Sequence, residues 1–164
     1  MIDTTVIMQW FSKELRRCMN EEEVKPRDMS YYCRVSPNVL GNYLQGKSFP
    51  KPWTLPIIAD FLGTTTNELL DFDEADDDSL VKYEVLSIFE DEEEFSMHVR
   101  NRIEEQINES HIGLEELSEM TGFTVHTIKR WLGRNGKQPE LPRTSDLLIL
   151  CDALDCTPSD LLGY

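Results

Sequence analysis

The chain of 164 residues is long enough for one medium domain or two small ones, and its 40% hydrophobic and 29% charged residues are typical of a folded protein rather than a disordered one. With 16 basic and 31 acidic residues, the formal net charge is -15, which taken as a whole would repel nucleic acids and anionic membranes. No apolar run approaches the roughly 20 residues of a membrane span. The N-terminus has no secretion-signal pattern, so we expect a cytoplasmic protein without membrane contact.

The first predicted domain covers residues 1–72 and has the sequence pattern of five short helices. An apolar stripe at spacings of three and four residues marks the first helix, and we assign its Trp10, together with Trp53 and Trp131 farther along, to the core. The second and third helices flank a tight turn, as in a helix-turn-helix motif. In chain order the five helices are expected near Val6–Met19, near Arg27–Cys33, from the cap Ser36 to Gly46, near Lys51–Leu62, and after a cap at Thr65–Asn67.

The next segment, residues 73–94, holds eleven acidic residues against Lys82 alone, a net charge of -10. Apolar residues between its acidic blocks, from Leu80 to Phe89, predict a short amphipathic helix that Asp78 or Ser79 would cap. The run 90–94 is open to two interpretations, a solvated helix start or a mimic of phosphate charge. We expect this segment to be an acidic, partly helical linker.

Residues 95–164 repeat the pattern of the first domain at an offset of 88 residues, which becomes 92 after four extra residues near 134–140. Thus Leu40–Leu44 falls on Ile128–Leu132, and Ile57–Leu62 on Ile149–Leu154. The predicted fold is all-α, with two five-helix domains joined by the acidic linker. The helices of the second domain are expected near Phe95–Asn108, before a tight turn, from the cap Thr124 to Gly133, near Thr144–Leu154, and after a cap at Thr157–Ser159.

Two segments, residues 24–47 and 112–132, are each followed by a proline, Pro50 or Pro142, and later by a Leu-Leu pair. In this order of turn, cap, apolar spacing and proline, both copies resemble the lambda-repressor-like, Xre/Cro-type helix-turn-helix family of phage and bacterial DNA-binding domains. The resemblance implies two lambda-repressor-like domains in tandem, at residues 1–72 and 95–164, with double-stranded DNA as the partner.

The position at which that family reads bases falls on Asn42 and Arg130, whose amide and guanidinium suit adenine and guanine edges. Both lie in windows without Asp or Glu, residues 29–59 and 120–139, and the second window has a charge of +4. Such local positive charge favours the binding of DNA phosphates, because salt screens the repulsion from acidic residues more than about 8 Å away. The plainer interpretation is a turn and a buried helix with few charges. The DNA-contacting candidates are Ser36, Asn38, Asn42, Lys47, Thr124, His126, Lys129, Arg130, Arg134 and Lys137.

The cysteines and histidines favour neither a disulfide framework nor a metal site. The four cysteines contain no CxxC pair, and no two histidines share a helix face with a carboxylate at the spacing of zinc ligands. The sequence has no Ser/His/Asp or Cys/His pairing and no glycine-rich phosphate loop. We therefore expect no enzyme, no metal and no cofactor.

The expected function is a sequence-specific DNA-binding transcriptional regulator, a phage or mobile-element repressor acting by promoter occlusion. The two copies would read neighbouring half-sites, or a homodimer would use one copy for each half-site. The alternative is an acidic inhibitor or adaptor, similar to a DNA mimic, that targets a nucleic-acid enzyme and binds a protein partner through the acidic linker. A dual role, with one copy on DNA and the other on protein, is also open.

Overall fold

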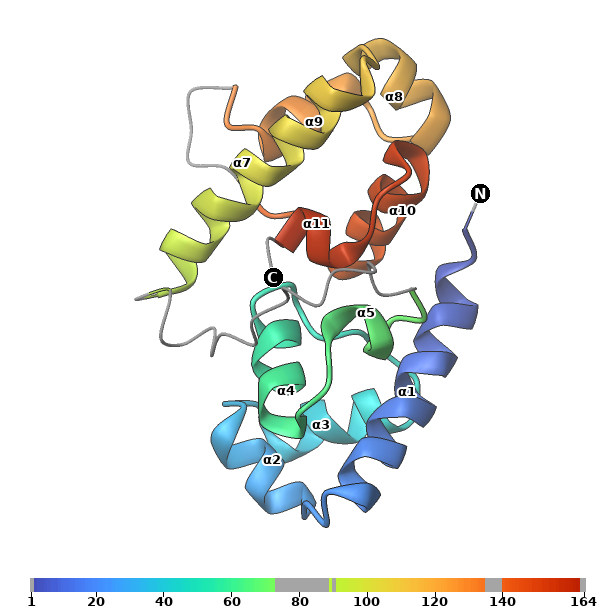
Figure 1. Cartoon of the computed structure of the whole chain (residues 1–164). Helices are drawn as coiled ribbons and strands as arrows, with labels where there is room; N and C mark the ends of the chain where they lie inside the picture. Colours follow the sequence, from blue (N-terminus) through green and yellow to red (C-terminus); the bar gives the residue numbers. More distant parts are fainter. Residues whose placement is uncertain (1, 73–88, 90, 135–139, 163–164) are drawn as a thin grey trace. The chain divides into compact units, whose positions relative to one another are not determined.

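The computed structural model describes residues 2–72, 89, 91–134 and 140–162, and within these ranges the regular elements are all helices (Figure 1). This confirms the expected all-α class for the described part of the chain. The chain divides into two compact units, Asp3–Ile88 and Phe89–Tyr164, the latter together with Met1–Ile2. No helix among the described residues combines the length and apolar character needed to cross a membrane.

The helices of the first unit follow the expected order closely. α1 packs against α3 and α5, and α2 packs against α3 and α4, so α3 is held between the first two helices. Phe11 of α1 is fully buried, and its ring contacts Tyr43 and Phe49 at centroid distances of 6.2 and 6.1 Å. The bounds are α1 Thr4–Glu21, α2 Pro26–Tyr32, α3 Pro37–Leu44, α4 Thr54–Leu62 and α5 Thr66–Leu69.

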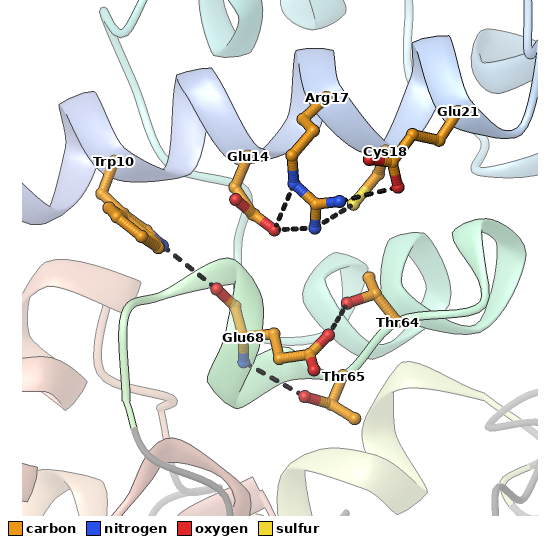
Figure 2. A network of polar contacts seen from close by, with 8 residues as sticks. All are labelled: Trp10, Glu14, Arg17, Cys18, Glu21, Thr64, Thr65 and Glu68. Carbon is orange, nitrogen blue, oxygen red and sulfur yellow. Dashed lines mark hydrogen bonds and ion pairs between the residues drawn. The ribbon is translucent and has the colours of Figure 1, made fainter.

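The prediction that Trp10 is a core residue is wrong, because the residue is 41% exposed. The indole lies at the edge of α1, and its Nε1 donates a hydrogen bond to the carbonyl oxygen of Glu68 in α5 at 3.1 Å (Figure 2). The Thr64 hydroxyl donates to the Glu68 carboxylate at 2.5 Å, and the Glu68 amide donates to Thr65 Oγ1 at 3.1 Å. The hydrogen bond of Trp10 therefore joins α1 to α5, where Glu68 also forms hydrogen bonds with Thr64 and Thr65. Trp131, by contrast, is buried as predicted.

The second unit also contains five described helices in chain order. α7 packs against α10 and α11, α8 packs against α9 and α10, and α10 packs against α11. Its buried side chains include Phe95, Ile103 and Leu117, all with at most 1% exposure. The bounds are α7 Glu92–Ser110, α8 Leu114–Thr121, α9 Val125–Trp131, α10 Thr144–Leu154 and α11 Pro158–Leu162.

α7 starts at Glu92, three residues before the expected start near Phe95, which bears out the interpretation of the acidic run as a solvated helix start. Asp91 caps the helix by accepting a hydrogen bond from the Glu94 amide at 2.9 Å, so the acids at 92–94 form the first helical turn. Three carboxylates at a helix N-terminus interact favourably with the helix dipole, which explains why the helix extends back into the acidic run. Of the amphipathic helix predicted between Asp78 and Phe89, residues 78–88 lie outside the described residues.

Candidate nucleic-acid interface

The helix-turn-helix of the second unit is built from α8, a short turn and α9. α8 ends at Gly122, whose φ of +82° lies in the left-handed region that favours glycine. Thr124 then caps α9, as predicted, by accepting a hydrogen bond from the Thr127 amide at 3.1 Å. Ile128 and Trp131 are buried and hold α9 against the unit. Because they occupy one side of the helix, the side chains between them face outward.

The outward face of α9 carries three of the predicted DNA-contacting residues. His126 and Lys129 are exposed, and Arg130 is partly exposed, with 39% of its side chain accessible. His126 and Arg130 are four residues apart and therefore lie on one face, with Lys129 beside them. The structure thus brings a ring, an ammonium and a guanidinium together on one short helix. All three can donate hydrogen bonds to phosphate oxygens or base edges.

Ion pairs compensate part of the positive charge on this helix-turn-helix. Arg130 Nε lies 3.2 Å from Glu140 Oε2, and Arg134 Nη2 lies 3.1 Å from Glu104 Oε1. Within the described part of the chain, Lys129 has no acidic group at ion-pair distance. Glu140 lies one residue beyond the acid-free window of the sequence, and Glu104 comes from α7. The +4 charge counted along the sequence therefore overstates the positive charge available to a ligand.

Polar contacts from α7 hold the C-terminal end of α9 in place. Arg100 Nε donates to the carbonyl oxygen of Leu132 at 2.9 Å, and Arg100 Nη2 lies 3.9 Å from Glu104 Oε2. The Arg134 amide donates to the Lys129 carbonyl at 2.9 Å across a left-handed glycine. Arg134 is exposed, and its guanidinium reaches back to Glu104. Arg100, Glu104 and Leu132 thus position the end of the helix that carries the candidate cations.

In the first unit, α2, the turn after it and α3 occupy the corresponding positions and carry other side chains. Ser36 caps α3, as predicted, by accepting a hydrogen bond from the Val39 amide at 3.2 Å, and Leu40 and Tyr43 are its buried anchors. Asn38 and Asn42 are exposed and lie four residues apart on the outward face. α3 therefore presents amides where α9 presents a ring and cations.

α1 holds the C-terminal end of α3 much as α7 holds that of α9. The carbonyl oxygen of Leu44 accepts hydrogen bonds from Ser12 Oγ at 2.6 Å and from Arg16 Nε at 2.8 Å. The Lys47 amide donates to the Asn42 carbonyl at 2.9 Å, again across a left-handed glycine. Ser12 precedes its leucine by 32 residues, as Arg100 precedes Leu132. The repeat offset of 88 residues equates Ser12 with Arg100, and this was the signal that could have revealed these positioning residues from the sequence.

Cations of the first unit are distributed differently from those of the second. Within the described residues, four basic side chains near its helix-turn-helix have no acidic group at ion-pair distance: Lys25, Arg27, Arg34 and Lys47. Two aromatic rings missed by the sequence analysis, Tyr31 and Tyr32, are exposed at the end of α2, and Tyr32 stacks on Phe61 at 5.1 Å. Lys137, the remaining predicted contact, lies outside the described residues.

The groups with shifted pKa values lie away from these outward helix faces. Burial raises the pKa of the Cys33 thiol to about 12, and burial together with Cys156 raises the pKa of Cys151. Burial and the charge of Arg102 lower the pKa of His98, although Glu105 and a backbone hydrogen bond to Leu162 act in the opposite direction. Among the described residues, no three His, Cys, Asp or Glu side chains gather as metal ligands would.

Comparison with known proteins bears on one of the two units. No curated protein and no solved structure matches the chain. A match to a protein-family model lies in the second unit and does not include the first, so the second tandem copy stays a prediction. Residues 102–164, from within α7 through α11, match the Cro/C1-type HTH DNA-binding domain family, which supports the helix-turn-helix family for this part of the chain.

Proposed function

We propose that the second unit binds double-stranded DNA in a sequence-specific manner, with α9 entering the major groove. The observation that carries the proposal is the outward face of α9, where His126, Lys129 and Arg130 project from a helix anchored by buried Ile128 and Trp131. The family match over residues 102–164 supports it. A helix of this width fits the major groove of B-DNA, where base edges differ in their donors and acceptors.

Within this proposal each outward residue of the second unit has a role that follows from its chemistry. Arg130 donates two hydrogen bonds to guanine O6 and N7, the commonest specific contact of an arginine in the major groove. His126 donates to a base edge or a phosphate at the start of α9. Thr124, Lys129, Arg134 and Lys137 contact the phosphate backbone, which fixes the register of the helix on the duplex without carrying sequence information.

We also propose that the first unit is a second DNA-binding copy. Its support is the shared local design: a hydroxyl cap, two buried anchors in the third helix, and a hydrogen bond from the first helix to the end of the third. Asn42 would pair with adenine, while Ser36, Asn38 and Lys47 would contact the backbone. Because Asn42 and Arg130 differ, the two copies would read different half-sites. A homodimer that uses one copy for each half-site is the competing geometry.

The finer form of the proposal is a transcriptional repressor of the phage or mobile-element kind, without enzymatic activity, that acts by occluding a promoter. It rests on the resemblance to lambda-repressor-like proteins. The competing function is an acidic inhibitor of a nucleic-acid enzyme, which the net charge of -10 over residues 73–94 favours. A repressor would act through the outward faces of α3 and α9, which would bind DNA. An inhibitor would act through the acidic segment, which would bind the enzyme.

Selection from random duplex DNA at two salt concentrations tests the proposal on the full chain. Arg130→Ala should weaken binding to the enriched sequence by about 1–3 kcal/mol, roughly five- to 150-fold, and relax the selection at one position. Asn42→Ala should do the same at another position if the first unit also reads DNA. Arg143→Ala and Asn20→Ala are matched controls, since both residues are exposed and lie outside α3 and α9.

The opposite result is equally definite. If no sequence is enriched at low salt, and the chain instead captures a basic nucleic-acid enzyme in a manner abolished by neutralising the acids of residues 73–94, the DNA-binding proposal is wrong and the inhibitor function replaces it.

A further inference from the structure

We propose that Glu140 and Glu104 act as internal substitutes for DNA phosphate, holding Arg130 and Arg134 in the free protein and thereby lowering its affinity for DNA. The inference rests on the proposed function and adds to it two acidic residues that set the strength of binding. The inference concerns the second unit, because both of these ion pairs lie within it.

The geometry at Arg130 supports this role. Its Nε is enclosed by the protein and has no hydrogen-bond partner among the described residues, and the facing charge is Glu140 Oε2 at 3.2 Å. The side chain as a whole is 39% exposed, so the accessible part of the guanidinium lies beyond Nε. Glu140 is itself 66% exposed and can therefore turn into solvent without a large desolvation cost. A DNA phosphate can thus replace the Glu140 carboxylate as the ion-pair partner of Arg130.

At Arg134 the carboxylate is that of Glu104, which also lies near a second arginine, Arg100. Glu104 Oε1 contacts Arg134 Nη2 at 3.1 Å, and its other oxygen lies 3.9 Å from Arg100 Nη2. Arg100 is tied to the carbonyl of Leu132 and stays in place. When a phosphate attracts Arg134, Glu104 therefore keeps an opposite charge, and a partly buried carboxylate is not left alone. The ion pair can open at little cost.

The expected size of the effect follows from the exposure of these pairs. Ion pairs between partly exposed side chains shift equilibria by about two- to fivefold. A carboxylate beside an arriving phosphate also repels it over roughly one Debye length, about 8 Å at physiological salt. Glu140→Gln and Glu104→Gln should each therefore tighten DNA binding by about two- to fivefold at low salt, and the gain should shrink as salt is raised.

The matched control is Glu93→Gln, which makes the same change of charge on the same helix as Glu104. Glu93 is exposed in the first turn of α7, eleven residues before Glu104. At 1.5 Å per residue this is about 16 Å along the helix, or roughly two Debye lengths. A gain seen with Glu140→Gln or Glu104→Gln but not with Glu93→Gln reports a local interaction rather than the net charge of the protein.

Double substitutions show whether each glutamate acts through its arginine. The dissociation constant is measured on the enriched duplex for Arg130→Ala with and without Glu140→Gln, and for Arg134→Ala with and without Glu104→Gln. Most of each gain should disappear once the arginine is absent, because only the direct repulsion of phosphate remains. Such coupling is not expected of a glutamate that merely stabilises the fold.

The outcomes separate this inference from the function on which it rests. If the wild-type chain selects a duplex but Glu140→Gln and Glu104→Gln bind no tighter than Glu93→Gln, the proposal that the two glutamates substitute for phosphate is overturned and DNA binding stands. A gain that persists in full without the arginine also overturns it. If neither wild type nor variants bind any duplex at low salt, both proposals fail.

Discussion

The two units place different side chains on third helices that are held in closely similar ways. α3 and α9 share a hydroxyl cap, two buried anchors and a bonded C-terminal carbonyl. α3 presents the amides of Asn38 and Asn42 outward, whereas Arg130 and Arg134 at α9 form ion pairs with glutamates. The comparison teaches that counting charges along a helix does not give the charge a ligand meets. Pairing with acids from elsewhere in the unit decides it.

The largest effect is expected when an equivalent buried residue of the third helix is removed from each unit. Leu40→Ala and Ile128→Ala each empty a site that is 1% exposed, and each should lower the free energy of unfolding by about 2–5 kcal/mol. Because the anchors belong to different compact units, each variant should destabilise mainly its own unit. Urea unfolding followed by residue-resolved NMR measures this. Equal loss in both units would show that they unfold as one.

A smaller effect is expected at the two caps. Ser36→Ala and Thr124→Ala each remove an oxygen that accepts a backbone hydrogen bond, and each should cost about 1 kcal/mol of stability. Ser36→Thr and Thr124→Ser retain the oxygen and serve as controls. Thermal unfolding of the four variants measures the difference. Caps that contribute nothing would make each alanine variant as stable as its control.

The distribution of charge can be tested through the salt dependence of DNA binding. Lys47 has no acidic partner in the described part of the chain, whereas Arg134 is paired with Glu104. If both units bind DNA, Lys47→Ala should reduce the slope of log K against log salt by about one, the loss of one phosphate contact. Arg134→Ala should reduce it by less, because the ion pair already offsets its charge. An equal or larger change for Arg134→Ala would contradict the comparison.

The smallest effect concerns the thiols, which differ in accessibility. Burial raises the pKa of Cys33 from 9.0 to about 12, and Cys151 is fully buried, whereas Cys156 is partly exposed. Thiolate is the reactive form, so Cys156 should be alkylated first at neutral pH, and Cys33 and Cys151 slowly. Mass spectrometry of timed samples measures the order. Early modification of Cys33 in the folded protein would contradict its burial.

The raised pKa of the Cys33 thiol also predicts how the stability of the protein changes with pH. Below pH 9 the Cys33 thiol is neutral in both folded and unfolded chains, so its contribution to stability is fully present. Between pH 9 and about 12 the unfolded chain loses this proton and the folded chain keeps it, so the free energy of unfolding should fall as pH rises. Urea titrations over this range, with Cys33→Ala as the control, measure the decline. A Cys33→Ala variant with the same pH dependence would remove the thiol as its cause.

The sequence by itself determined the helices and their caps. Ser36 and Thr124 cap the third helices as predicted, and α10 begins and ends at the predicted residues. These features depend on contacts within about four residues, which residue type and spacing record directly. The order of helices within each unit was available for the same reason.

Only the tertiary structure decided which polar and aromatic groups meet. It placed Trp10 at an exposed edge of α1, where an indole nitrogen found a carbonyl of α5. It also joined Arg130 to Glu140 and Arg134 to Glu104, residues 10 and 30 positions apart. Local spacing does not encode such partners, because chain packing sets the distance between them. The positive charge that DNA would meet at α9 is therefore a property of the folded unit.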